Sequence, residues 1–235
     1  ALVIHGHFYQ PPRENPWTGV IDDQPSAQPY PNWNDRVYYE CYRPNAFARV
    51  FDLKTGLIES ITNNYAYINF NLGPTLLSWM EDYHPGTYKR ILEADKESAE
   101  RNNGHGNAIA QGYNHTILPL CNDADRLTQV KWGISDFKYR FKRDPESLWL
   151  PETACNDATM SVLINEIMKY LILSPEQAER VRPLAGGDWQ DVASGNIDTG
   201  VPYRYFHKDG SKRYIDIFFY NKDIARGVAF EGALS

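Results

Sequence analysis

The sequence alternates short apolar stretches with longer amphipathic ones, and this alternation is the feature that most limits the possible folds. The apolar stretches cover residues 2–8, 65–73, 108–115, 147–152 and 170–175. Between them, residues 74–101, 123–141 and 156–168 carry apolar side chains three and four positions apart, as helices do. We expect helices to start at Pro74 and Pro85, and caps at Asp123 or Asp125 and at Asn156. Strands that alternate with helices at steps of about 25 to 45 residues predict a parallel α/β sheet or barrel.

The composition excludes several classes of protein. The 235-residue chain has a net charge of -6, and its basic residues are dispersed, so we expect no nucleic-acid partner. No apolar run is long enough to cross a bilayer, and we expect no membrane partner. Cys41, Cys121 and Cys155 are odd in number and far apart, which favours a reducing, cytoplasmic location.

One stretch, residues 147–155, reads as a buried strand that ends in a carboxylate. Leu148 to Leu150 is short and apolar, and Pro151 stops further strand pairing just before Glu152. In α/β folds, ligands bind at the carboxyl ends of the strands, so Glu152 is a candidate catalytic residue. The alternative is that Glu152 caps the next helix or pairs with an arginine.

Histidines lie on or at the end of two other predicted strands. The period of two in residues 2–8 puts His5 and His7 on one face, and His115 ends the stretch at residues 108–115. Three histidines that meet at strand ends suit substrate binding or zinc ligation, and they also suit hydrogen bonding within a core. The residues alone leave these three alternatives open.

Two further segments have distinct patterns. Residues 10–43 are rich in proline, asparagine and aromatic residues, and we expect a long, functional loop there, because flat rings suit stacking against sugars. Residues 203–220 contain Asp209-Gly210 between two apolar runs, which predicts a β-hairpin. The chain contains no GxGxxG, GxxxxGK[ST] or GxSxG motif, which weighs against nucleotide binding and serine hydrolase chemistry.

Three segments together resemble glycoside hydrolase family 57, specifically its long uncharacterised branch. They are HGHFYQPPRENPW at residues 5–17, QGYNHTILPL at residues 111–120 and WLPETA at residues 149–154. The similarity extends through residues 215–234, and therefore over nearly the whole chain.

The resemblance implies an incomplete (β/α)7 TIM-like barrel over residues 1–235, with parallel strands inside, helices outside and its C-terminal part missing. It also implies a retaining mechanism on α-linked oligo- or polysaccharides, with Glu152 as the nucleophile and no metal or other cofactor. The residues that it places at the substrate are His5, His7, Gln10, His115 and Trp149.

The acid/base of the family is an aspartate in a motif like Asp-Gly-Glu on a later strand, and this sequence contains no such motif. We therefore expect the chain to be the N-terminal part of a longer, truncated enzyme. Asp188, Asp191 and Asp216 are weak substitutes within the chain. Two alternatives remain: a metal-dependent carbohydrate hydrolase or deacetylase with His5, His7 and His115 as ligands, and a non-catalytic glycan-binding module.

Overall fold

A parallel sheet whose strands follow one another in chain order forms the centre of the molecule. The computed structural model describes residues 2–232. Strand ladders join β1 to β4, β5 to β6 and β7 to β11, and single bridges from Phe70 to Ala108 and from Ser147 to Tyr170 connect these pairs. The parallel strands are β1 (His5–Phe8), β4 (Asn69–Leu72), β5 (Ala110–Gln111), β6 (Leu148–Trp149), β7 (Tyr170–Leu173) and β11 (Tyr214–Phe219).

The sheet is curled, because side chains from strands that are not neighbours touch. The ring of His5 on β1 stacks on Trp149 of β6 with 4.8 Å between the ring centroids, although β4 and β5 lie between these strands. In a flat sheet, three strand spacings would separate the backbones by about 14 Å. The ladders and bridges show a curled α/β sheet of six parallel strands within residues 2–232. Among these residues they do not show the closed seven-stranded barrel that the family resemblance implies.

Proline and asparagine residues set where the helices begin. The predicted starts at Pro74 and Pro85 are confirmed, since proline is tolerated where the first N–H groups have no helical partner. Asn156 caps its helix as predicted, whereas the cap before Asp123 is Asn122 and not Asp123 or Asp125. The helices are α3 (Pro74–Tyr83), α4 (Pro85–Arg101), α5 (Asp123–Phe141), α6 (Asp157–Asn165) and α7 (Lys222–Phe230), and none of the described helices is long and apolar enough to span a bilayer.

Helix α5 packs very closely on the sheet. A Cβ atom at Gly133 would lie 1.9 Å from the carbonyl oxygen of Gln111, so only glycine permits this approach of α5 to β5. At the end of the helix, the Arg143 guanidinium binds the buried Asp95 carboxylate of α4 at 2.7 and 2.9 Å. A second arginine, Arg140, is buried among Asp136, Glu81, Ser78 and Tyr88. The helices around β5 and β6 are therefore fixed by backbone contact and by paired charges.

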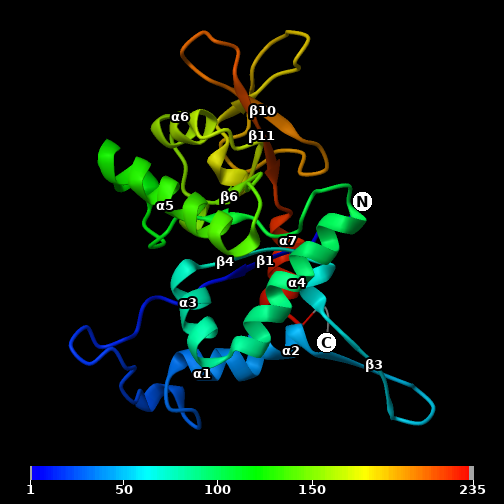
Figure 1. The fold of residues 1–235 in the computed structure, drawn as a ribbon. Helices are drawn as coiled ribbons and strands as arrows, with labels where there is room; N and C mark the ends of the chain where they lie inside the picture. Colours follow the sequence, from blue (N-terminus) through cyan, green and yellow to red (C-terminus); the bar gives the residue numbers. More distant parts are fainter. Residues whose placement is uncertain (1, 233–235) are drawn as a thin grey trace.

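The segments outside this sheet match the sequence predictions only in part. Residues 10–43 are not one loop, because they contain η1 (Pro25–Ala27), α1 (Trp33–Val37) and the π-helix η2 (Tyr38–Tyr42), followed by α2 (Arg43–Ala46). The predicted hairpin is confirmed as β10 (Tyr203–Phe206) paired antiparallel to β11. A hairpin of β2 (Ala48–Phe51) and β3 (Ile58–Thr62) was not predicted, and it projects from the body of the molecule (Figure 1).

Several predicted strands and helices were longer than the elements in the structure. The strand expected over residues 65–73 spans only Asn69–Leu72, after the 3-10 turn η3 (Asn64–Ala66). The strand expected over residues 108–115 is reduced to Ala110–Gln111, and the helix expected to carry Ile167 and Met168 ends at Asn165. The other short elements are η4 (Leu118–Leu120), η5 (Pro151–Thr153), η6 (Pro175–Gln177), β8 (Arg180–Val181) and β9 (Gln190–Asp191).

Ile167 ends α6 in a backbone conformation that suits glycine or asparagine. Its φ is 63°, and the amides of Ile167 and Met168 bond back to the carbonyls of Ile164 and Leu163, as in a Schellman motif. A β-branched residue is strained there. The side chain is 79% exposed, so little apolar burial compensates for the strain.

We expect Ile167→Asn to raise the free energy of unfolding by about 1 kcal/mol, because asparagine tolerates this conformation. Urea denaturation of the two proteins measures the difference. Ile61→Asn is the matched control, since Ile61 is similarly exposed but lies in a strand, and that change should bring no gain. A variant at position 167 that is no more stable than the parent contradicts the assignment of strain.

Candidate active site

Side chains from three of the parallel strands and their following loops meet around one column of rings. His5 and His7 point from β1 toward Trp149 of β6, and His115 comes from the turn after β5. Neighbouring rings are nearly parallel, and their centroids lie 4.8 Å apart for His5 and Trp149, 4.9 Å for Trp149 and His7, and 5.2 Å for His7 and His115. The family resemblance placed these four residues at the substrate together with Gln10, and the fold brings the four together.

Tyr9 extends the column at its outer end. Its ring stacks on His115 with 3.9 Å between the centroids, and it lies 6.4 Å from His7. Tyr9 was not among the predicted site residues, although it lies two positions after His7 in the same motif. The period of two along residues 5–9 was the signal that could have identified it.

A layer of carboxamides beneath the rings was also missed. Asn69 and Asn71 on β4 lie directly opposite His5 and His7 in the strand register, and Gln111 lies on β5. His5 contacts the amide oxygen of Asn71 at 3.0 Å through Nε2 and that of Asn69 through Nδ1. The alternating Asn-Phe-Asn sequence at residues 69–71 was the available signal, since it puts both amides on one face of a strand.

The surroundings of the histidines favour the neutral imidazole. Burial lowers the pKa of His5, although its contacts with Asn69 and Asn71 act in the opposite direction. The protein packed around His7 lowers its pKa to about 4, and the neighbouring His115 and His5 add to this effect. The pKa of His115 is lowered by partial burial, against the opposing charge of Glu152. Neutral rings offer one donor and one acceptor each, which suits hydroxyl groups.

The carboxylate and its neighbours sit on strained backbone. Glu152, Thr153 and His115 have φ values of 55°, 52° and 56°, in the left-handed region. Non-glycine residues in this region cost about 1–3 kcal/mol each and cluster at functional sites. Glu152 lies in η5, directly after β6, and its side chain is exposed, while Asn156 caps the next helix in its place. Within residues 2–232, Glu152 has no ion-pair partner, so neither structural alternative for it is realised.

Gln10 forms hydrogen bonds with residues outside the ring column. Its amide nitrogen donates to the Tyr42 hydroxyl at 3.1 Å, and its amide oxygen accepts from Arg13 at 2.9 Å. Its backbone carbonyl accepts a hydrogen bond from the Thr75 hydroxyl at 2.7 Å. These contacts tie the loop after β1 to the start of α3, and both polar ends of the Gln10 side chain have protein partners.

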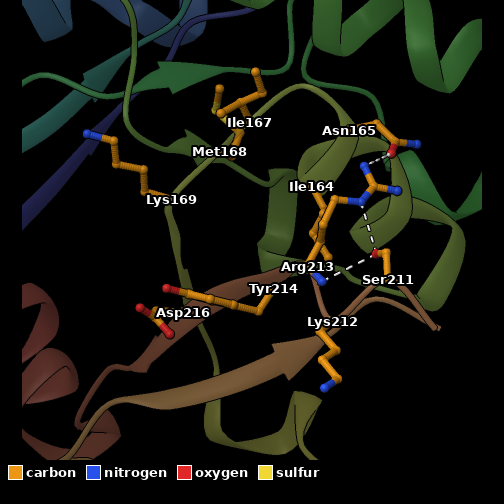
Figure 2. A pocket seen from close by; sticks show the side chains of 10 residues that line it. All are labelled: Ile164, Asn165, Ile167, Met168, Lys169, Ser211, Lys212, Arg213, Tyr214 and Asp216. Carbon is orange, nitrogen blue, oxygen red and sulfur yellow. Dashed lines mark hydrogen bonds between the residues drawn. The ribbon is translucent and has the colours of Figure 1, made fainter. Parts of the chain in front are cut away.

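The three candidate aspartates lie elsewhere. Asp216 is on β11 opposite Tyr170, near the amino ends of the strands, and it binds Arg204 at 2.8 Å. It lines a cavity of about 780 Å³ whose wall includes Met168, Arg213 and Tyr214 (Figure 2). This cavity is at the opposite end of the strands from Glu152, and we do not assign the chemistry to it. Asp191 ends β9 and accepts a hydrogen bond from the Ala193 amide, and Asp188 is exposed.

The histidine nitrogens are directed at each other and at amides. His7 Nε2 and His115 Nε2 lie 3.1 Å apart, and both His5 nitrogens face asparagine side chains. In the part of the chain that the structure describes, no three histidine, cysteine, aspartate or glutamate side chains form a group suited to a metal ion.

Known proteins match this chain in sequence and in fold. A curated relative, alpha-amylase 1 of Dictyoglomus thermophilum, is 26% identical over 107 residues, which are 45% of this chain and 15% of that protein. The crystal structure of a 4-alpha-glucanotransferase from Thermococcus litoralis superposes with a TM-score of 0.63 at 15% identity, over 99% of this chain and 30% of that one.

A maltose-forming exo-type amylase from a Pyrococcus species gives a TM-score of 0.66 at 15% identity, over 97% of this chain and 36% of that one. The chain thus spans well under half the length of these relatives. The sequence model described as glycosyl hydrolase family 57 matches residues 2–233. Because this match covers nearly all of the sequence, the chain belongs to glycosyl hydrolase family 57.

Proposed function

We propose that this chain is the nucleophile-bearing part of a retaining hydrolase or glucanotransferase that acts on α-linked glucans. The observation that carries the proposal is the position of Glu152, an exposed carboxylate on strained backbone at the carboxyl end of β6, close enough to His115 to act on its charge. Family membership supports the reaction class, and the named activities of the amylase and glucanotransferase relatives support an α-glucan substrate.

In the proposed reaction, a Glu152 oxygen attacks the anomeric carbon and the glycosidic C–O bond breaks. A second carboxyl group, about 5–5.5 Å from Glu152, gives its proton to the departing oxygen. That group then takes a proton from water, or from the hydroxyl of an acceptor glucan, which attacks the glycosyl ester and releases Glu152. Hydrolysis and transfer differ only in this acceptor.

We assign the proton donor to an aspartate outside this chain. Asp188, Asp191 and Asp216 are poor substitutes, since Asp216 is held by Arg204 and the other two lie on exposed segments of the insertion after β7.

The proposal extends to the fold and the cellular location. The six parallel strands and their curl agree with a (β/α)7 barrel that is completed by further residues, and the three free thiols agree with a reducing, cytoplasmic location.

The rings provide the substrate surface in this proposal. His5, His7 and His115 are neutral near pH 7. The facing Nε2 atoms of His7 and His115 offer one donor and one acceptor to a sugar hydroxyl, while both nitrogens of His5 contact Asn69 and Asn71. Trp149 holds His5 and His7 parallel between strands, and Tyr9 covers the outer face of His115. Gln10 has a supporting role here, because its amide is bound by Tyr42 and Arg13.

We expect Glu152→Gln to abolish turnover of an α-glucan by the full-length enzyme, with a loss of at least about a thousandfold, because the amide is not a nucleophile. Initial rates of reducing-end release measure it. Glu146→Gln is the matched control, since Glu146 precedes the same strand at its other end and binds Lys169 and His105. That variant should keep nearly full activity.

A loss of less than about tenfold in Glu152→Gln would refute the nucleophile assignment. A parent enzyme that binds glucan without turnover would point to a non-catalytic module. Loss of activity on treatment with a chelator, with recovery on added zinc, would favour the metal-dependent alternative.

The lowered histidine pKa values also predict how stability depends on pH. In the unfolded chain, these histidines bind protons below about pH 6.5, whereas the folded protein resists protonation of His7 until about pH 4. The free energy of unfolding should therefore fall as the pH drops from about 7 to about 5. Urea denaturation at both pH values should show a smaller fall in His7→Gln than in His105→Gln, a change at an exposed histidine outside the column. Equal falls in the two variants would contradict the neutral state of His7.

A further inference from the structure

Asn71 is the most enclosed polar residue of the site. It lies on β4, its side chain is 0% exposed, and it is paired with His7 in the strand register. Its carboxamide touches three side chains from two other strands: His5 Nε2 at 3.0 Å, His7 Nδ1 at 2.9 Å and Gln111 Oε1 at 2.5 Å.

The lengths of these contacts indicate which way the amide faces and which His7 nitrogen carries the proton. The Asn71 nitrogen donates to the Gln111 oxygen and lies 2.9 Å from His7 Nδ1, closer than the Asn71 oxygen at 3.2 Å, so the nearer contact has Nδ1 as the acceptor. The proton of the neutral His7 ring is then on Nε2, which lies 3.1 Å from His115 Nε2. His7 therefore donates to His115, whose own proton is on Nδ1.

His5 is held from both sides by the same strand. Its Nε2 meets the Asn71 oxygen, and its Nδ1 meets the Asn69 oxygen. Asn69 cannot turn its amide over, because its nitrogen donates to the Asn107 carbonyl. A neutral ring has one N–H, so His5 donates to only one of these oxygens at a time, while both restrict its rotation.

We propose that Asn71 is a positioning residue that sets the tautomer of His7 and the orientation of both His5 and His7. The consequence for substrate rests on the proposed function. A sugar hydroxyl that replaces the contact between His7 and His115 meets an N–H from His7 and a lone pair from His115, which are the two partners that a hydroxyl needs. The opposite tautomer of His7 would exchange these roles.

The chemistry of the position explains why an amide is needed. Aspartate has the same shape but only acceptor atoms, so His7 Nδ1 would have to carry a proton. A carboxylate there also favours the imidazolium form of both histidines. The other titratable groups near the two rings are Tyr9 and His115, which stack on His7, Glu152, whose charge acts on His115, and Tyr170, which interacts with Asn69.

Correlation of the ring protons with the ring nitrogens by ¹⁵N NMR tests the proposal directly in the full chain. In the parent protein near pH 7, we expect His7 to show the Nε2–H tautomer. In Asn71→Asp, we expect the neutral His7 ring to carry its proton on Nδ1 instead, and its titration midpoint to rise by about one to two pH units. Asn64→Asp is the matched control, since Asn64 is a partly buried amide that donates to Asn45 outside the site, and it should leave the His7 signals unchanged.

A parent His7 with its proton on Nδ1 overturns the proposal. So does an Asn71→Asp protein that keeps the parent tautomer and midpoint. The near-identical shape of aspartate favours folding, and the spectrum of the other histidines shows whether the variant has folded. The two proposals fail separately, because an active Glu152→Gln enzyme refutes the nucleophile and leaves the tautomer result intact.

Discussion

The contact between β1 and β6 through His5, His7 and Trp149 is the interaction on which the site depends. Two imidazoles from one strand lie against the indole of another, with two strands between them in the sheet. This contact requires the sheet to curl, and the curl directs the side chains of β4 and β5 into the same interior. The carboxamides of Asn71 and Gln111 are buried there as a result. Asn71 finds partners in the histidines and in the Gln111 oxygen, whereas the Gln111 nitrogen has no partner within residues 2–232.

The loops that leave the strands carry the reactive group at some cost in backbone energy. Three residues with positive φ, His115, Glu152 and Thr153, lie in the turns after β5 and β6. Packing beneath them must compensate, and Gly133 shows how close that packing is, because α5 touches the backbone of Gln111 directly. The buried pair of Arg143 and Asp95 ties α5 to α4 at the other end of the same strands. A rigid scaffold thus supports a strained, exposed carboxylate.

Local chemistry explains which parts of the fold the sequence predicts. Pro74, Pro85 and Asn156 mark helix starts because their effect is confined to one turn, and Asp209-Gly210 marks a hairpin for the same reason. Residues 65–73 were misjudged because Tyr65 and Ala66 are buried in a 3-10 turn, not in a strand. The β2–β3 hairpin was missed because its apolar residues, including Phe51 and Leu57, are exposed and follow no core pattern.

The residues of the site were also predicted only in part. Glu152, His115 and the His-x-His pair were predicted because they end apolar strands. Asn69, Asn71 and Gln111 were missed because the buried amide layer forms only once the sheet has curled, although the Asn-Phe-Asn alternation places two of these amides on one face. Tyr9 escaped notice because its role depends on a contact with His115, more than a hundred positions away.

Trapping the covalent intermediate tests the account most directly. A fluorinated α-glucosyl fluoride, which forms the glycosyl ester quickly and hydrolyses slowly, would be incubated with the full-length enzyme, and the labelled peptide would be identified by mass spectrometry. The account predicts one glucosyl group on the peptide that contains residues 149–155, attached to Glu152. A label on another carboxylate, or turnover of the reagent by a single displacement with inversion at the anomeric carbon, would contradict it.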